Sequence, residues 1–391
     1  MGNSVSNSKK NIALFISSLH GGGAERVVSR LTKVLAGDYN VYVFLIDANN
    51  QQYECDKNCT IVDLGKGGKS FRTKELKTIT KINKAIKEYE IDTCISFLSG
   101  ANMINSFFVK GCRKLVSVRV YIHKDALNES THVGFDKYEV QAYRVFCRKC
   151  DKSVAITNKM AEALKEVYGL ADDKVCVIEN PYDIDEIKVD IEAGFSASDA
   201  DLRRFFEKYK TTIAIGRLSK QKDYFSQIKA FKKVADKVDN AGLVILGEGE
   251  QKDELQRFID ELQLSERVIL AGRKSNPFPY IAASELYIST SHVEGFPNGL
   301  VEAMACHVAP LHTNCLTGPE EILIDGSGIL LPDLAGKTGE VLERAIEEIA
   351  DVWIDILNDD KKRNDIAQKA YNRAKDYSYD NIAKKWKELI G

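Results

Sequence analysis

The sequence predicts an α/β protein made of two doubly wound, parallel-sheet (Rossmann-like) domains. With 391 residues, the chain is too long for one ordinary hydrophobic core, and two domains of normal size are expected. Short apolar runs alternate with amphipathic helical patterns, which is typical of parallel sheets covered by helices. This alternation stops near residue 180 and restarts after residue 208, which places the domain boundary between them.

The first domain is predicted to span residues 1–180. It opens with the apolar run "NIALFISSL", a buried strand, and continues into a helix whose apolar face carries Val27, Leu31 and Leu35. Two further helices are predicted over residues 74–89 and 159–169. The later strands are predicted at 41–46, 92–98, 114–120, 153–157 and 174–179.

The second domain is predicted to span residues 209–375. Asn180-Pro181 interrupts the pattern, and the polar residues 181–208 are interpreted as an inter-domain linker. A charged helix over 376–391 is expected to pack back toward the first domain. The strands of the second domain are predicted at 211–218, 241–249, 267–273, 285–290, 308–313 and 327–332.

Composition favours a soluble, cytoplasmic protein. No run of 18 apolar residues predicts a membrane span, and the N-terminus lacks the apolar core of a secretory signal. Gly2 and Ser6 match a short myristoylation pattern, although a polar leader would look the same. The nine cysteines are an odd number and indicate reduced thiols; Cys147 and Cys150 lack the further ligands that zinc needs.

Charge is distributed unevenly along the chain. Residues 1–180 contain 27 Lys+Arg and 20 Asp+Glu, a balance of +7, and subtraction from the totals of 55 and 57 leaves 28 and 37, a balance of −9. A basic half suggests an anionic partner, and we expect peripheral contact with an anionic membrane, although solvated charge alone would also produce the asymmetry. No aromatic-basic motif supports nucleic-acid binding.

Ligands of parallel sheets bind at the carboxyl ends of the strands, so the loops that follow the strands are the candidates for binding chemistry. Gly21-Gly22-Gly23 follows the first strand and permits close backbone approach at a helix N-terminus, though a tight turn would look the same. The triplet is not Gly-x-Gly-x-x-Gly, so a dinucleotide site is not supported.

In the second domain, cationic and glycine-rich loops follow successive strands. "GRLSKQKD" supplies Arg217 and Lys222, a planar fork and a point charge that suit a diphosphate. "GEGEQKDEL" contains Gly247 and Gly249, and "AGRKSNPF" contains Arg273. Each loop alone is explained by surface charge, but their joint placement predicts an anion site.

The most informative stretch is "HVEGFPNGLVEAMA", in which Glu294 and Glu302 lie on either side of a turn. Asn298 is a good N-cap candidate, and the amides of Gly299 and Leu300 would then offer an anion site. One carboxylate would face hydroxyls on each side of bound phosphates, the layout of a nucleoside diphosphate sugar. In the alternative interpretation, Glu302 is a solvated helix residue and Glu294 caps a loop.

These residues resemble the retaining glycosyltransferases of family 4, which have the GT-B fold: two such domains facing a central cleft. The Glu-x7-Glu element from Glu294 to Glu302 is the most specific match. Bacterial enzymes that extend lipid-linked or surface oligosaccharides, some using UDP-N-acetylhexosamines, look most similar. Supporting matches, in the family's order, are "GGGAER", "GRLSKQKD", "LGEGEQKDEL", "LAGR" and "GPEEI".

The resemblance implies a role for each site residue. Glu302 would bind the ribose hydroxyls, Glu294 the donor sugar, and Arg217 with Lys222 the diphosphate. The loop at Arg273 would pack against the base. The remaining donor-binding positions implied are Gly22, Gly23, Gly247, Phe296, Pro297, Asn298, Gly299 and Leu300.

One position departs from the family pattern. Many relatives carry an active-site histidine after the strand that corresponds to "LVSVR", where this chain has Arg119. An arginine can stabilise phosphate charge but is a poor general base. His123 is the nearest substitute, and an ordinary loop histidine is the alternative interpretation.

The resemblance implies a retaining glycosyltransferase that moves a sugar from a nucleotide donor, a UDP-hexose or UDP-N-acetylhexosamine, to a glycan or lipid-linked acceptor in surface polysaccharide or glycoconjugate synthesis. No cofactor or metal is expected; Asp183-x-Asp185 and Asp199-x-Asp201 look like metal motifs of another fold but lie in the predicted linker. A GT-B sugar-nucleotide epimerase and a non-catalytic sugar-nucleotide-binding assembly subunit are the alternatives.

Overall fold

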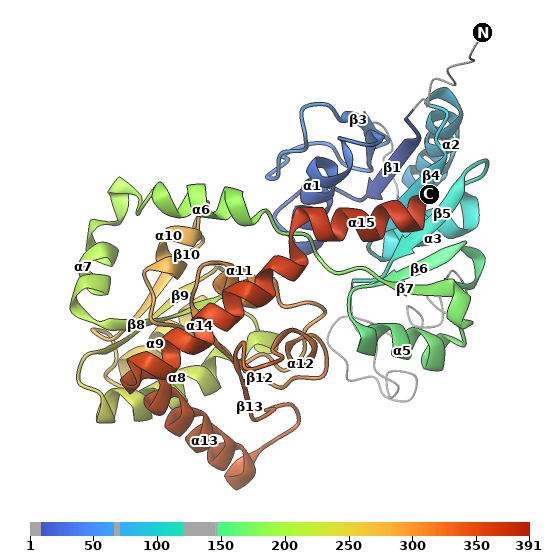
Figure 1. The fold of residues 1–391 in the computed structure, drawn as a ribbon. Coiled ribbons are helices and arrows are strands. Elements are labelled where there is room, and N and C mark those ends of the chain that lie inside the picture. Colours follow the sequence, from blue (N-terminus) through green and yellow to red (C-terminus); the bar gives the residue numbers. More distant parts are fainter. Residues whose placement is uncertain (1–8, 66–70, 120–144, 146) are drawn as a thin grey trace. The chain divides into compact units, whose positions relative to one another are not determined.

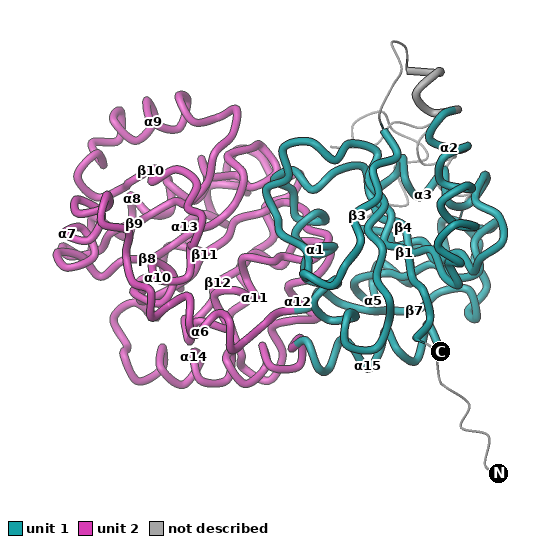
Figure 2. Tube along the Cα trace, turned by 90° about the horizontal axis from the view of Figure 1, so that it is seen from above, with its two compact units in different colours: residues 1–181, 379–391 teal, residues 182–378 magenta. Residues whose placement is uncertain are grey.

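The computed structural model describes residues 9–65, 71–119, 145 and 147–391. The chain forms two compact units, shown in teal and magenta in Figure 2. Unit 1 comprises the chain up to Pro181 together with Tyr379–Gly391, and unit 2 is Tyr182–Ser378. Both are parallel α/β units, as the sequence predicted (Figure 1).

Unit 1 contains a seven-stranded parallel sheet in the order β3-β2-β1-β4-β5-β6-β7. Its strands are β1 (Asn11–Ile16), β2 (Asn40–Leu45), β3 (Thr60–Asp63), β4 (Thr93–Phe97), β5 (Arg113–Ser117), β6 (Lys152–Ala155) and β7 (Val175–Val177). Its main helices are α1 (Gly23–Leu35), α2 (Phe71–Glu88), α3 (Ser99–Phe108), α5 (Asn158–Tyr168) and α15 (Tyr379–Ile390). The prediction missed β3, a four-residue edge strand with no fully buried position.

Alternate residues of β1 serve two hydrophobic cores, because successive side chains of a strand point to opposite faces. Leu14 joins a core with α1 and α15, whereas Phe15 joins a core with α2 and α3. The final helix α15 completes the first of these cores and buries Trp386 fully. The last helix of the chain therefore belongs to unit 1.

Unit 2 contains a six-stranded parallel sheet in the order β10-β9-β8-β11-β12-β13. Its strands are β8 (Lys210–Ile215), β9 (Ala241–Leu246), β10 (Val268–Gly272), β11 (Leu286–Ser289), β12 (Ala309–Thr313) and β13 (Ile329–Leu331). Its helices include α6 (Ile184–Glu192), α7 (Ala200–Lys208), α8 (Tyr224–Lys237), α9 (Lys252–Glu261), α10 (Phe278–Ala282), α11 (Asn298–Ala305), α12 (Pro319–Ile322), α13 (Gly339–Asn358) and α14 (Asp360–Ala374). All strands predicted for this domain are present.

The stretch 181–208 is not a linker. It forms α6 and α7, joined through a short 3-10 turn, η3 (Ala197–Asp199), and from Tyr182 onward it belongs to unit 2. Asp183 caps α6 by accepting a 2.9 Å hydrogen bond from the backbone N–H of Glu186. Leu202 and Phe205 anchor α7 in the interior. Few but well-placed apolar residues and a side-chain cap thus produce helices from a polar sequence.

Within the described ranges, we find no helix that combines the length and apolar character needed to cross a bilayer. Each of the nine cysteines is a free thiol.

Candidate functional site

The candidate site lies where the strand order of unit 2 reverses, between β8 and β11. In open parallel sheets this switch point separates the loops that leave the two strands and creates the usual ligand crevice. The loop after β8 carries Arg217 and the 3-10 turn η4 (Lys220–Lys222), and the loop after β11 carries Glu294. The structure therefore brings two of the predicted loops to one edge.

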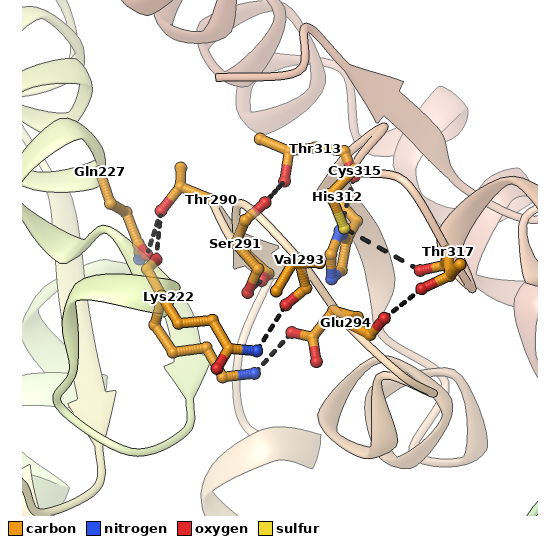
Figure 3. Close-up of polar contacts among 12 residues, drawn as sticks. Lys222, Gln227, Thr290, Ser291, Val293, Glu294, His312, Thr313, Cys315 and Thr317 are labelled. Atoms are coloured by element: carbon orange, nitrogen blue, oxygen red, sulfur yellow. Dashed lines mark hydrogen bonds and ion pairs between the residues drawn. The ribbon is translucent and has the colours of Figure 1, made fainter. Parts of the chain in front are cut away.

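Lys222 and Glu294 form an ion pair across this switch point. The Nζ to Oε1 distance is 2.5 Å, and the side chains are only 23% and 9% exposed. The two loops are also tied by Gln221 Nε2, which donates to the Val293 carbonyl at 2.6 Å, and by Thr290 Oγ1, which donates to the Lys222 carbonyl at 3.1 Å. Figure 3 shows the ammonium and the carboxylate directed at each other.

Glu294 is ionised in spite of its burial. Burial acts to raise the pKa of this carboxyl, but the charge and hydrogen bond of Lys222, with a hydrogen bond from Ser291, outweigh it and lower the pKa. A buried carboxylate in a fixed position, with one cation beside it, is suited to accept hydrogen bonds from a polar ligand.

The loop after β12 closes the other flank of Glu294. Thr317 Oγ1 donates to the Glu294 carbonyl, and Thr313 Oγ1 donates to the Ser291 carbonyl at 2.7 Å (Figure 3). These bonds hold the backbone on both sides of Glu294, so its carboxylate position is set by three loops of unit 2.

The N-terminus of α11 differs from the prediction. Its N-cap is Pro297, with no side-chain cap bond, and Asn298 is the first helical residue. The Asn298 side chain instead accepts a 2.6 Å hydrogen bond from the Tyr182 hydroxyl. The Leu300 N–H, predicted to face phosphate, donates to the Pro297 carbonyl at 3.1 Å. The N–H groups of Asn298 and Gly299 still precede the first i−4 partner of the helix and can face an anion.

Two predicted glycines lie in close packing, and at Gly247 a side chain would collide with the backbone. A Cβ on Gly299 would lie 3.1 Å from the Tyr287 hydroxyl, so α11 approaches β11 closely at this residue. A Cβ on Gly247 would lie 1.8 Å from the Gly216 carbonyl oxygen, which leaves no room for a side chain. Gly247 therefore lets the loops after β8 and β9 approach each other closely, and Gly299 lets α11 approach β11.

Glu302 is 1% exposed, which excludes the interpretation of a solvated helix residue. It lies on α11, among the buried residues of that helix, one turn beyond Gly299. Buried carboxylates are rare in stable folds, and this one lies beside a predicted ligand edge. The two glutamates of the turn are therefore both buried.

The other residues predicted in this unit are more peripheral. Arg217 is 76% exposed on its side chain and lies 3.5 Å from Glu250, while Arg273 is exposed at the end of β10. Phe296 is buried and packs edge-on against Tyr377, with a ring-centroid distance of 5.5 Å. Pro297, the next residue, is the N-cap of α11.

In unit 1, Gly22 is the N-cap of α1 and Gly23 its first residue. A Cβ on Gly22 would collide with the Glu25 carboxylate, which lies over this turn; burial raises the pKa of Glu25. Arg119 donates to Ser117 Oγ at 2.8 Å and to Asn180 Oδ1, and it lies over the Phe97 ring. Arg119 is thus built into unit 1, and His123 lies outside the described residues.

Sequence analysis missed His312, which is fully buried near the end of β12. Its Nδ1–H donates to the Thr313 carbonyl at 2.8 Å, so Nε2 is left as an acceptor, and it has no hydrogen-bond partner in the described part of the chain. Burial lowers the pKa of His312 to about 4, so the ring is neutral. The signal in the sequence was a polar residue at the end of an apolar strand.

His312 should make folding stability depend on pH. The unfolded chain binds a proton near pH 6.5 and the folded chain only near pH 4, so stability is greatest above 6.5 and is lost as the pH falls between these values. The contribution amounts to at most roughly 3 kcal/mol. When the free energy of unfolding is measured with urea between pH 7 and pH 4, it should fall less steeply with decreasing pH in His312→Gln than in wild type. An equally steep fall in both proteins would contradict this prediction.

Among the described residues, no group of three or more His, Cys, Asp or Glu is arranged to hold a metal ion.

Two family models match the chain. The model described as "Glycosyltransferase Family 4" matches residues 21–186, and that described as "Glycosyl transferases group 1" matches residues 199–373. Together they span both parallel-sheet units.

Individual relatives extend over nearly the whole chain. The chain is 29% identical over 390 residues to the Campylobacter jejuni N-acetylgalactosamine-N,N'-diacetylbacillosaminyl-diphospho-undecaprenol 4-alpha-N-acetylgalactosaminyltransferase, covering 96% of this chain and 98% of that protein. It is 28% identical to an uncharacterized glycosyltransferase of Methanocaldococcus jannaschii, covering 81% and 83%.

Solved structures share the same fold. The crystal structure of Anabaena HepE in complex with UDP-glucose superposes with a TM-score of 0.78 at 20% identity, covering 97% of this chain and 99% of that chain. With two family models over both units and the Glu-x7-Glu pair buried at the switch point, the chain belongs to glycosyltransferase family 4 and has the GT-B fold.

Proposed function

We propose that this glycosyltransferase is a retaining enzyme that moves a hexose or N-acetylhexosamine from a UDP-sugar to a glycan or lipid-linked oligosaccharide. The observation that carries the proposal is the buried Lys222–Glu294 ion pair beside the N-terminus of α11. One cation, two amide groups and two buried carboxylates provide partners for a diphosphate and for the hydroxyls attached to it.

In this proposal each residue has one task. Lys222 neutralises the leaving diphosphate, helped by the N–H groups of Asn298 and Gly299. Glu302 accepts hydrogen bonds from ribose hydroxyls, and Glu294 orients the transferred sugar. Catalysis is then mainly positioning and charge stabilisation, and the leaving phosphate assists the incoming hydroxyl on the same face of the sugar.

The donor preference draws support from the relatives. The named Campylobacter jejuni relative is an N-acetylgalactosaminyltransferase acting on an undecaprenol-linked substrate, and the HepE crystal structure holds UDP-glucose. We carry over the chemical class, a UDP-sugar and a polyprenyl-diphosphate glycan, to this chain as a proposal.

The test is a transfer assay with a panel of UDP-sugars and undecaprenyl-diphosphate oligosaccharides, preceded by a thermal-shift screen for the donor. NMR of the product should show the anomeric configuration of the donor. An inverted product would overturn the retaining mechanism. Conversion of the UDP-sugar without acceptor would favour an epimerase, and binding without turnover would favour an assembly subunit.

Transfer should not require a divalent cation. In this proposal Lys222, whose ammonium is paired with Glu294, takes the part of neutralising the diphosphate that a metal has in other enzymes. Activity in EDTA should therefore remain within about threefold of the untreated value, a change of less than 1 kcal/mol. Complete loss that magnesium restores would argue against this assignment; a partial effect is compatible with magnesium binding to the released nucleotide.

Unit 1 should bind anionic vesicles reversibly. On its surface Lys149 lies 5.0 Å from the Phe107 ring, and the neighbouring Phe108 is 42% exposed. Each basic residue near an anionic surface adds about 1 kcal/mol, which salt weakens. Co-sedimentation with phosphatidylglycerol vesicles should be lost at high salt. It should be reduced in the double variant Lys110→Glu/Lys149→Glu, in which Lys110 is an exposed residue two positions after Phe108. Equal, negligible binding to neutral and anionic vesicles would reject the membrane contact.

A further inference from the structure

The loop that follows β10, residues 273–276, is held from outside the sheet. Among the described strands, β10 lies at the edge and pairs with β9 alone, and its pairing shifts register between Leu270 and Gly272. Gly272 then adopts a left-handed backbone with φ of 69°, which turns the chain toward Arg273. Strand pairing therefore does little to fix this loop.

The α6–α7 segment, residues 182–208, holds the loop after β10 through side-chain contacts. Lys274 Nζ donates to both carboxylate oxygens of Asp199 at 2.8 Å, and the two side chains are 18% and 15% exposed. The Tyr280 hydroxyl, from α10, also donates to Asp199. Both oxygens of Asp199 thus accept hydrogen bonds from side chains of unit 2.

Two further contacts join the same segment to this loop and to α10, the helix that follows it. Asn276 Nδ2 donates to the Asp190 carbonyl at 2.8 Å. Phe195 packs against the Tyr280 ring with a centroid distance of 4.5 Å. The hydrogen bonds of Lys274 and Tyr280 lower the pKa of Asp199, so this carboxylate stays charged. The loop after β10 is therefore fixed by a network that lies beyond the edge of the sheet.

The position of this loop determines what it can touch. On the β12 side of Glu294, Thr313 and Thr317 bond to the loop after β11, so the chain itself fills that flank. The end of β10 lies on the opposite flank, two strands from β8, or about 10 Å. A donor whose diphosphate lies at Lys222 would extend its nucleoside in this direction.

We propose that Asp199 is a positioning residue for nucleotide selectivity. Through Lys274 it holds the loop at Arg273 against the nucleoside of the donor, so that one base is accepted in preference to others. The inference rests on the proposed function, because it needs a nucleoside diphosphate sugar at this edge. It assigns the α6–α7 segment a task beyond its place in the fold of unit 2.

The test compares Asp199→Asn and Lys274→Met with wild type. Dissociation constants for UDP, GDP and ADP would be measured by calorimetry, and KM and kcat with the donor sugar. We expect the preferred nucleotide to bind about tenfold more weakly, a change on the scale of one charged hydrogen bond. The ratio of the dissociation constants of the second-best and the preferred nucleotide should shrink. KM for the donor sugar should rise, and kcat should change little. Lys274→Arg, which keeps the charge, should restore the ratio.

Glu285→Gln is the matched control. It breaks the partly buried 2.7 Å ion pair with Arg363 at the start of β11, the other end of the sheet. The control should lower the melting temperature without altering the ratio. If wild type discriminates but Lys274→Met keeps that ratio, this inference fails alone. If wild type binds none of the three nucleotides, the proposed function fails and the inference fails with it.

Discussion

Lys222→Met is expected to lower kcat/KM for the donor by two to three orders of magnitude. Removing the ammonium leaves Glu294 as a buried carboxylate without its cation, and it removes the charge proposed to stabilise the leaving diphosphate. Breaking a buried pair in this way costs about 3–5 kcal/mol, which is roughly 10²- to 10⁴-fold. Because the Lys222 side chain is 23% exposed, solvent screens part of this charge, and the loss of kcat/KM should lie toward the lower end of this range.

Glu294→Gln separates the role of the Glu294 carboxylate from that of the Lys222 ammonium. It keeps the shape of the side chain but removes its charge, so kcat should fall more than donor affinity if Glu294 orients the reacting sugar. Steady-state kinetics and thermal unfolding would be measured for both variants. Lys229→Met is the control, because it breaks the exposed ion pair between Lys229 on α8 and Glu343 on α13, whose side chains are 41% and 54% exposed. Wild-type kinetics in Lys222→Met would refute the assigned role.

Glu302→Ala should mainly weaken donor binding, by roughly 10- to 150-fold. The ribose hydroxyls would lose a charged acceptor, and such a hydrogen bond is worth about 1.5–3 kcal/mol. Because Glu302 is 1% exposed, the change also leaves a cavity inside unit 2, so stability must be followed in parallel. Calorimetry with UDP, and kinetics with the donor sugar, would measure the two effects.

Glu302→Gln fills the same volume and is the informative partner of the alanine variant. It should keep the melting temperature closer to wild type while still weakening nucleotide binding. Glu261→Ala, at an exposed position on α9, is the surface control and should behave like wild type. Nucleotide affinity unchanged in both Glu302 variants would show that this carboxylate serves the fold alone.

The sequence by itself determined the elements and the edge at which the site lies. Strand and helix periodicities are local, and the apolar runs at β1, β9 and β11 could therefore be located without any knowledge of long-range contacts. Because parallel strands end at one edge, the loops carrying Lys222 and Glu294 could be assigned to a common site. Short elements escaped: β3 has four residues and no fully buried one.

Only the tertiary structure decided which of those residues pair and which are buried. Lys222 meets Glu294 across 72 residues of sequence, and Asp199 meets Lys274 across 75, distances over which no periodicity carries information. The N-cap at Pro297 was also decided by packing, because the Asn298 side chain finds the Tyr182 hydroxyl instead of its own helix. His312 looked like one polar residue at a strand end, and its burial follows from the elements that cover β12. Local chemistry set the list of candidates, whereas burial and charge pairing are properties of the folded chain.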